Sequence, residues 1–283
     1  MKVVLYRAAR LGLARDSLDG LSVGDAYGAQ HFTRADLRTP PWPWTDDTQM
    51  AAILVRHLHA HAPIDQDLLA GAWAAGCEPL RGYGVGAYLT LQAIAAGAPW
   101  RDAARAGFGG QGSYGNGAAM RVAPLGAYHA GDPATAAREA ARQAEITHAH
   151  PEGVAGAVAV AVAASVAAHA RLTGGRPNLF GAVLAHVDPA TAVWKMVRRA
   201  KRLRGPAEAA RVLGTGERVT AQDTVPFTVW VADRFLGDFR AAVEACCAAG
   251  GDVDTTAAIV GGIVAAHDPA VPREWLENRE PLP

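Results

Sequence analysis

Alanine-rich runs fill most of this chain, and they restrict its fold more than any other feature of the sequence. Alanine is the strongest helix former, whereas the alternation of β-branched residues expected of strands is almost absent. Glycine and proline gather between these runs, as in short connections between helices. The pattern predicts an all-α protein with helices over residues 6–21, 46–61, 65–75, 85–96, 118–128, 133–147, 154–168, 189–203, 206–213, 225–235, 239–249 and 255–266.

The length and composition favour one domain. Half of the 283 residues are hydrophobic, which is enough to bury a large core. The chain is longer than an average domain, but no fixed-period repeat, long linker or change in composition marks a boundary. We expect one compact helical domain over residues 1–283. The first 20 residues carry charges throughout and lack the apolar centre of a signal peptide.

Charge and cysteine content exclude some classes of function. The formal net charge is zero, which argues against general nucleic-acid binding and against binding to anionic membranes. Residues 154–168 are apolar but shorter than the roughly 20 residues that cross a bilayer, so we interpret them as a buried helix. Cys77, Cys246 and Cys247 lack metal-type spacing and favour a reducing, cytoplasmic compartment. The sequence leaves the oligomeric state open.

Two acidic clusters lie far apart in the chain, and each places aspartates beside threonines before an alanine-rich run. Their members are Thr45, Asp46, Asp47, Thr48, Asp252, Asp254 and Thr255. Adjacent carboxylates repel each other, so they favour a nearby cation or helix N-terminus. A capped helix with an acidic first turn explains either cluster alone. We predict that the clusters meet, because their oxygen atoms together suit Mg²⁺, Mn²⁺ or Ca²⁺.

A glycine-rich stretch leads into the helix predicted at residue 118. Its members are Gly112, Ser113, Tyr114, Gly115, Asn116 and Gly117. Backbone amides in front of a helix can cradle a phosphate, and the Tyr114 ring can stack on a base. The stretch lacks the Gly-Lys-Ser/Thr ending of a P-loop, and no strand precedes it as in a dinucleotide-binding fold. A structural turn explains the same glycines equally well.

Histidines and a basic run give weaker signals. His148 and His150 lie at a corner between two predicted helices. A pair two residues apart in a loop can bind a transition metal, but we interpret His148 as a substrate-binding residue. The basic residues from Arg198 to Arg204 are typical of a solvated helix face. Docking of an acidic protein partner is the alternative for that run.

Taken together, five segments resemble the ADP-ribosylglycohydrolase family, which includes dinitrogenase-reductase-activating glycohydrolases and ADP-ribosyl-arginine and ADP-ribosyl-serine hydrolases. They occur in the family's order over nearly the whole chain, and residues 224–227 look like a further family segment. The five are Gly24-Asp25-Ala26-Tyr27-Gly28, Trp44-Thr45-Asp46-Asp47-Thr48, residues 112–121, Thr147-His148 and Gly251-Asp252-Val253-Asp254-Thr255. The resemblance implies an orthogonal bundle of helices with a centre of two Mg²⁺ or Mn²⁺ ions.

The same resemblance implies a role for each matched position. The metal ligands would be Thr45, Asp46, Asp47, Asp252, Asp254 and Thr255. Residues 112–116 would hold the diphosphate and adenosine, and His148 would line the cleft. The implied reaction hydrolyses the bond at the anomeric carbon of ADP-ribose on a modified protein side chain or another ADP-ribose conjugate. Asp46, Asp47 and Asp254 are the candidates for accepting a proton from water.

One position departs from the family pattern. Several members carry a glutamate shortly after the Gly-Asp-x-x-Gly segment, whereas this chain has Gln30 and no carboxylate until Asp36. A glutamine can hydrogen-bond a substrate but cannot exchange a catalytic proton. We therefore predict that Gln30 contacts substrate, and we prefer an arginine linkage to a serine linkage. The alternatives are an inactive ADP-ribose-binding protein and a two-metal hydrolase of a related metabolite.

Overall fold

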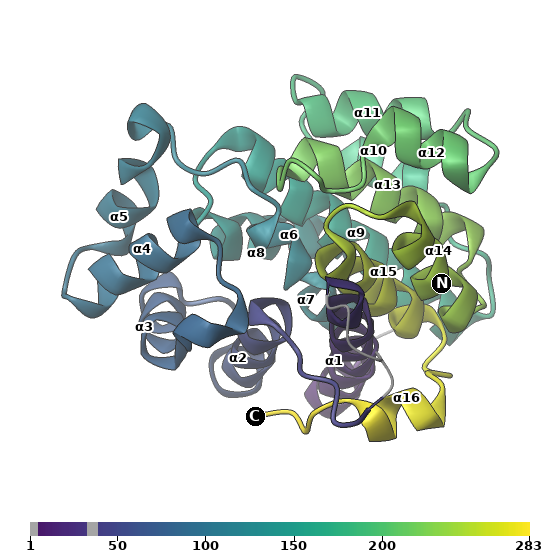
Figure 1. The fold of residues 1–283 in the computed structure, drawn as a ribbon, viewed down its shortest axis with the longest axis horizontal. Helices are drawn as coiled ribbons and strands as arrows, with labels where there is room; N and C mark the ends of the chain where they lie inside the picture. The colour runs from purple at the N-terminus through teal and green to yellow at the C-terminus, as the bar shows by residue number, and fades with distance from the viewer. Residues whose placement is uncertain (1–4, 33–38) are drawn as a thin grey trace.

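The computed structural model describes residues 5–32 and 39–283, so residues 1–4 and Asp36 lie outside the described residues. Within these ranges the chain forms helices and no β-strand, and the predicted all-α class is confirmed (Figure 1). Two isolated β-bridges pair Trp42 with Arg279 and Gly115 with Thr220. The second bridge joins the predicted glycine loop to a segment more than 100 residues later.

The α-helices follow one another with short connections, as the glycine and proline pattern predicts. In chain order they are α1 (Arg7–Ala29), α2 (Asp46–His61), α3 (Gln66–Gly76), α4 (Val85–Ala95), α5 (Trp100–Ala106), α6 (Gly117–Met120), α7 (Ala123–Tyr128), α8 (Pro133–Glu145), α9 (Pro151–Thr173), α10 (Leu179–His186), α11 (Ala192–Ala200), α12 (Pro206–Leu213), α13 (Ala221–Arg234), α14 (Phe239–Ala249), α15 (Val253–His267) and α16 (Arg273–Asn278). Single turns of 3₁₀ helix are η1 (Gln30–Phe32), η2 (Pro79–Arg81) and η3 (Phe108–Gly110).

Several predicted boundaries are wrong, among them the end of α9 and the start of α13, and three of them have a clear physical reason. Helix α1 continues to Ala29 instead of ending before Gly24, because its glycines serve packing and not a turn. The helix predicted over residues 118–128 is two helices, since Pro124 stands in the first turn of α7. Helix α11 begins at Ala192, where the Thr191 side chain caps it, and not near residue 189. The short helices α5, α10 and α16 had no prediction.

Glycines on one face of α1 bring α15 unusually close. Gly20, Gly24 and Gly28 are spaced four residues apart and therefore share a face of the helix. A Cβ atom built on Gly24 would lie 2.2 Å from the Ala257 carbonyl oxygen, and one on Gly28 would lie 2.7 Å from the Asp254 Cα atom. Any side chain at these positions would push the helices apart. The contact therefore sets the N-terminus of α15 beside the C-terminal half of α1.

Helix α9 forms the centre of the hydrophobic core. It is long and apolar enough to cross a membrane by length and composition, and it is the one such helix in the described ranges. However, 83% of its most apolar stretch of 18 residues is buried inside the protein. It packs against α7, α8, α10 and α15, and the burial confirms the predicted core helix.

Candidate active site

A cleft of about 490 Å³ opens where the N-termini of α2, α4, α6 and α15 approach one another. It contains residues from both acidic clusters and from the glycine loop. The predicted site residues that line it are Asp46, Asp47, Ser113, Tyr114, Gly115, Asn116, His148, Asp252, Asp254 and Thr255. The cleft thus joins the two clusters that the sequence separates by more than 200 residues.

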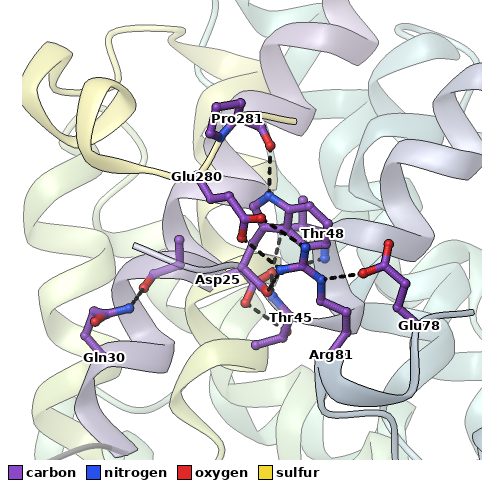
Figure 2. Close-up of polar contacts among 10 residues, drawn as sticks. Asp25, Gln30, Thr45, Thr48, Glu78, Arg81, Glu280 and Pro281 are labelled. Carbon is purple, nitrogen blue, oxygen red and sulfur yellow. Dashed lines mark hydrogen bonds and ion pairs between the residues drawn. The ribbon is translucent and has the colours of Figure 1, made fainter. Parts of the chain in front are cut away.

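The buried carboxylate of Asp25 fixes the start of α2 against α1. It accepts hydrogen bonds from the Thr45 backbone amide (2.9 Å) and hydroxyl (2.8 Å), and from the amide (3.1 Å) and hydroxyl (2.5 Å) of Thr48 (Figure 2). The Thr45 hydroxyl also accepts from the Asp47 amide at 3.3 Å, as predicted for an N-cap. Asp25 therefore determines where the first turn of α2 presents Asp46 to the cleft. The sequence marked Asp25 within a family segment without assigning it a role.

A second set of contacts fixes the start of α15. The Asn116 side-chain amide donates to Asp252 Oδ2 at 2.7 Å and to the Thr224 hydroxyl at 3.1 Å. The Asp252 backbone amide donates to the Thr215 carbonyl at 3.0 Å. Gly251 has φ +80°, and a Cβ atom there would lie 2.2 Å from the Thr215 hydroxyl oxygen, so only glycine fits this turn. Asn116 therefore orients an acidic residue in addition to lining the cleft.

Burial and mutual repulsion both act on the aspartates of the cleft. Burial, and then the neighbouring charges, raise the pKa of Asp46 to about 7 and that of Asp254 to about 9. The pKa of Asp47 is raised well above its ordinary value by burial and then by repulsion from Asp25, Asp254, Asp46 and Asp252. Carboxylates from both clusters are therefore close enough to interact. Such a group either holds protons or gains stability from a cation.

The oxygen atoms of this cluster fit a divalent cation. Carboxylates and hydroxyls are the donors that Mg²⁺, Mn²⁺ and Ca²⁺ take in proteins. Asp47 Oδ1 is buried and makes no hydrogen bond, so it has an oxygen to offer. In the described ranges, no group of three or more His, Cys, Asp or Glu side chains is already arranged around one metal position. Asp252 accepts one hydrogen bond from the Asn116 side chain at 2.7 Å, and Asp254 accepts one from the Thr255 amide at 2.8 Å, so each carboxylate keeps lone pairs that a cation can use.

His148 supports the glycine loop from behind. Its Nδ1 atom lies 2.8 Å from the Thr147 hydroxyl, which accepts from the Arg121 guanidinium at 2.9 Å. A Cβ atom on Gly117 would lie 2.8 Å from the His148 ring, and one on Gly115 would lie 3.3 Å from its Nε2 atom. Burial, and then the charge of Arg121, lower the pKa of His148 to about 3. The imidazole is therefore neutral at pH 7 and serves as a hydrogen-bonding group at the cleft.

Arg121 places a buried positive charge beneath the carboxylates. Its guanidinium donates to the Gln143 side chain at 2.8 Å and lies 3.9 Å from the centre of the Trp73 ring. Burial lowers the pKa of Arg121 to about 9, and the attraction of Asp46 opposes that shift, so it remains a cation at pH 7. No ion pair among the described residues includes it. Arg121 is the last residue of the family segment over residues 112–121, but the sequence alone assigns no role to it.

Several backbone amides of the glycine loop are already engaged. Gly112 donates to the Gly107 carbonyl (3.2 Å), Gly115 to the Ser113 hydroxyl (3.1 Å) and Asn116 to the Val219 carbonyl (3.3 Å). The loop is therefore partly a structural turn, and fewer of its amides can reach a phosphate than the glycine count suggests. Gly112 itself packs behind the loop and does not line the cleft.

Two strained residues stand at the cleft. Phe108 and Val219 both have φ +54°, a backbone conformation that is uncommon for residues other than glycine, and both side chains are 55% exposed. The Phe108 ring lies 5.0 Å from the Tyr114 ring. Arg218, which precedes Val219, also lines the cleft with an exposed side chain. No sequence signal singles out these three residues.

Gln30 lies outside the cleft lining. Its side-chain amide donates to the Ala26 carbonyl at 3.0 Å, one turn back along α1 (Figure 2). A contact between Gln30 and substrate therefore stays a prediction. His150 caps α9 by accepting from the Glu152 amide at 3.1 Å, which gives it a structural role. The Arg198 guanidinium lies 4.8 Å from the Trp194 ring centre on an exposed face, apart from the cleft.

The sequence matches the family model described as ADP-ribosylglycohydrolase over residues 7–281. The chain belongs to the ADP-ribosylglycohydrolase family. ADP-ribosylhydrolase ARH3 of Gallus gallus is 27% identical over 275 residues, which cover 84% of this chain and 74% of that protein. The ADP-ribosylhydrolase ARH3 of Homo sapiens is 28% identical over 278 residues, covering 86% and 76%. An uncharacterized protein of Archaeoglobus fulgidus is 28% identical over 287 residues, covering 93% and 90%.

A solved structure described as an ADP-ribosylglycohydrolase-related protein complex has the same fold. Its TM-score is 0.66 at 24% identity, over 96% of this chain and 94% of that chain. The predicted family and its helical fold are thereby confirmed. As a member of this family, the protein is a hydrolase of ADP-ribosyl conjugates.

Proposed function

We propose that this protein is a divalent-metal-dependent hydrolase that releases ADP-ribose from arginine side chains of modified proteins. The observation that carries the proposal is the meeting of Asp46 and Asp47 with Asp252 and Asp254 in one cleft. These carboxylates come from the N-termini of α2 and α15, and the glycine loop forms another part of the same cleft. The carboxylates would bind cations at one end of the cleft, and the glycine loop would receive a nucleotide at the other.

Six residues would hold two Mg²⁺ or Mn²⁺ ions: Thr45, Asp46, Asp47, Asp252, Asp254 and Thr255. When bound, such ions supply Lewis acidity and positive charge that activate water and orient the hydroxyls of a sugar. Asp46, Asp47 and Asp254 are the candidates for accepting the proton of the attacking water. The repulsion among these carboxylates favours the proposal, because it is relieved by bound cations.

The diphosphate and adenosine would bind between the glycine loop and Arg218. Arg218 is exposed, lines the cleft and makes no ion pair with any described residue, so its guanidinium is suited to a diphosphate. The aromatic pair Phe108 and Tyr114 offers ring faces for the adenine. His148, neutral at pH 7, offers a hydrogen bond without adding charge.

The chemistry of the leaving group favours an arginine linkage. An ADP-ribosylated guanidinium carries its own proton at neutral pH, so it departs as a neutral guanidine without an acid from the enzyme. A serine oxygen would depart as an alkoxide unless a general acid protonated it. Several family members have a glutamate shortly after the Gly-Asp-x-x-Gly segment, whereas this chain has no carboxylate there until Asp36, and Gln30 cannot supply that proton.

A panel of substrates tests the proposal. Peptides that carry ADP-ribose on arginine or on serine are incubated with the protein and Mg²⁺ or Mn²⁺, and the products are identified by mass spectrometry. We expect intact ADP-ribose, released faster from arginine than from serine, and no release in the presence of a chelator. Release of AMP would indicate a hydrolase that cuts the diphosphate. Binding of ADP-ribose without turnover of any conjugate would indicate a binding protein.

The proposal includes a reducing, cytoplasmic setting. Cys77, Cys246 and Cys247 are all free thiols. Burial raises the pKa of Cys247 to about 12, and burial also raises those of the other two, so the thiols are protonated at neutral pH. Protonated, partly buried thiols are unreactive and act as small packing groups.

A further inference from the structure

Helix α4 is apolar and yet largely exposed. Its sequence, VGAYLTLQAIA, contains no charged residue, and Leu91 is its only buried side chain. Val85 is 75% exposed and Leu89 is 60% exposed. The helix packs mainly against α3 and α5, and these three helices project from the rest of the molecule at the left of Figure 1. Exposed apolar side chains that gather on one face often mark a binding face.

Helix α4 begins at the acidic end of the cleft. A Cβ atom built on Gly82 would lie 3.6 Å from Asp46 Oδ1, and Val85 lines the cleft. Val85 and Leu89 are four residues apart in one helix and therefore lie on the same face. The apolar face thus starts inside the cleft, next to a carboxylate of the candidate site, and continues outward along α4.

The turn before α4 is firmly anchored. The Arg81 guanidinium lies 3.5 Å from the centre of the Trp44 ring and donates to both oxygens of Glu280, at 2.8 and 3.0 Å (Figure 2). It also donates to Glu78 at 3.2 Å. Leu80, the neighbour of Arg81, is 100% exposed. A fixed turn therefore presents a leucine to solvent five residues before Val85.

We infer that Leu80, Val85 and Leu89 bind the polypeptide that carries the ADP-ribosyl group, through apolar side chains next to the modified residue. This inference rests on the proposed function. The bond that is cut joins the ribose to the polypeptide, and the carboxylates that would position the ribose lie beside Gly82. The polypeptide consequently leaves the cleft along α4 and not past the glycine loop.

The side chains of α4 indicate which side chains a partner would need in order to bind it. A face without charged side chains cannot select a partner by ion pairs, but it gains free energy by covering apolar surface. The basic residues of α11 lie on a different part of the molecule, at the top of Figure 1, and do not border this face. The substrate class is therefore a protein whose modified residue is flanked by apolar side chains.

Two peptides of equal length test the inference. Each carries one ADP-ribosylated arginine and a fluorophore, with leucines on both sides of the arginine in one peptide and serines in the other. Affinities are measured by fluorescence anisotropy with a chelator present, and hydrolysis is measured separately with Mg²⁺ or Mn²⁺. We expect the full-length protein to bind the leucine peptide roughly five- to tenfold more tightly, as expected for covering part of an apolar side chain.

Substitutions on the face should remove that preference. The double variant Leu80→Gln/Leu89→Gln is expected to bind both peptides equally and to hydrolyse free ADP-ribosyl-arginine at the wild-type rate. Leu172→Gln is the matched control, because Leu172 is 39% exposed at the C-terminal end of α9 and does not line the cleft. It should keep the full preference for the leucine peptide.

Each contrary outcome has a distinct meaning. Equal binding of the two peptides by the wild type, or a preference that survives in the double variant, would overturn the inference. A wild-type dimer that Leu89→Gln converts to a monomer would overturn it too, because the face would then belong to a second copy of this chain. Absence of hydrolysis of either peptide and of ADP-ribosyl-arginine would contradict the proposed function, while the binding ratio would still decide the role of α4.

Discussion

Two walls of the same cleft are built in opposite ways. On the first wall, glycines let α1 and α15 touch through their backbones, and Asp25 holds the start of α2 with four hydrogen bonds. On the second wall, α4 packs mainly on two neighbouring helices, and every side chain except that of Leu91 stays partly or fully exposed. Reacting groups require fixed positions, whereas a face that recognises a partner must remain uncovered until the partner arrives. The contrast separates a place for chemistry from a place for recognition.

Removing one carboxylate of the first wall should have the largest effect. We expect Asp254→Asn to lower kcat/KM for ADP-ribose release by roughly a thousandfold, because a proposed cation ligand and a candidate proton acceptor are lost together. Added Mg²⁺ or Mn²⁺ should raise the melting temperature of the wild type and not that of the variant. Asp102→Asn, at an exposed carboxylate of α5, is the control. Wild-type activity in Asp254→Asn would show that the carboxylates of the first wall do not carry out the reaction.

Filling the contact between α1 and α15 tests whether the first wall depends on close backbone packing. Gly24→Ala places a Cβ atom where 2.2 Å separates it from the Ala257 carbonyl oxygen, so we expect a loss of roughly 3 kcal/mol in unfolding free energy. Activity should fall as well, since α15 carries Asp254. Gly12→Ala on the same helix has no atom within 4 Å of the added carbon and should stabilise the protein by up to about 1 kcal/mol. Urea unfolding measures both, and equal effects would contradict this account.

Burial also shifts the pKa of a histidine outside the cleft, in the opposite direction to the pKa values of the cleft aspartates. His129 is buried at the C-terminal end of α7, and neither ring nitrogen has a hydrogen-bond partner in the described structure. Burial, and then the Arg10 charge, lower its pKa from 6.5 to about 4, although Asp132 opposes the shift and Arg138 adds to it. Between pH 6.5 and 4, the unfolded chain therefore binds a proton at His129 and the folded protein does not. The contribution of the neutral imidazole to the unfolding free energy is complete above pH 6.5 and is lost as the pH falls toward 4.

Urea titrations at several pH values measure that effect. The stability difference between the wild type and His129→Gln should change between pH 6.5 and 4, with the wild type losing more on acidification. The difference between the two proteins is the quantity to follow, because the aspartates of the cleft have raised pKa values and contribute with the opposite sign. His59→Gln, at an exposed histidine of α2, is the control. Parallel curves for the wild type and His129→Gln would contradict the prediction.

The smallest effect should come from the residue that joins the two walls. Arg81→Lys keeps the charge but loses the planar contact with Trp44 and the paired hydrogen bonds to Glu280, so we expect a loss of about 1 kcal/mol. Hydrogen exchange of the α4 amides should become faster, while that of α15 stays unchanged. Arg101→Lys, at a more exposed arginine that also stacks on a tryptophan, should change neither. Equal acceleration of amide hydrogen exchange in α4 and α15 would contradict the proposed difference between the two walls.

Local signals in the sequence were sufficient for much of the fold. The helix over residues 46–61 is predicted correctly because Thr45 is a recognisable cap and the alanines that follow are strong helix formers. Gly24 and Gly28 misled the prediction, because a glycine that fits against another helix looks like a glycine in a turn. That distinction depends on the partner helix, which lies more than 200 residues away along the chain.

The residues of the site also divide into those with a local signal in the sequence and those without one. The aspartates, the glycine loop and His148 belong to recognisable segments, and the structure brings them into one cleft. Arg121 lies in a family segment but received no role from it, and Val219 and the α4 face carry no local pattern, since the surroundings of all three are set only by folding. Gln30 shows the converse, because its position shortly after a family segment suggested a substrate contact, whereas its side-chain amide donates to the Ala26 carbonyl of α1.

The pairing of α1 with α15 also bears on how the protein is made. The Ser17 hydroxyl of α1 donates to the Gly262 carbonyl of α15 at 2.8 Å, across 245 residues of sequence. On a ribosome, α1 and the first pair of cleft aspartates therefore emerge long before the helix that completes them. Until α15 appears, its place along the glycines of α1 is uncovered, and the growing chain cannot assemble the centre. Synthesis of α15 thus sets the earliest time at which the two groups of cleft aspartates can meet.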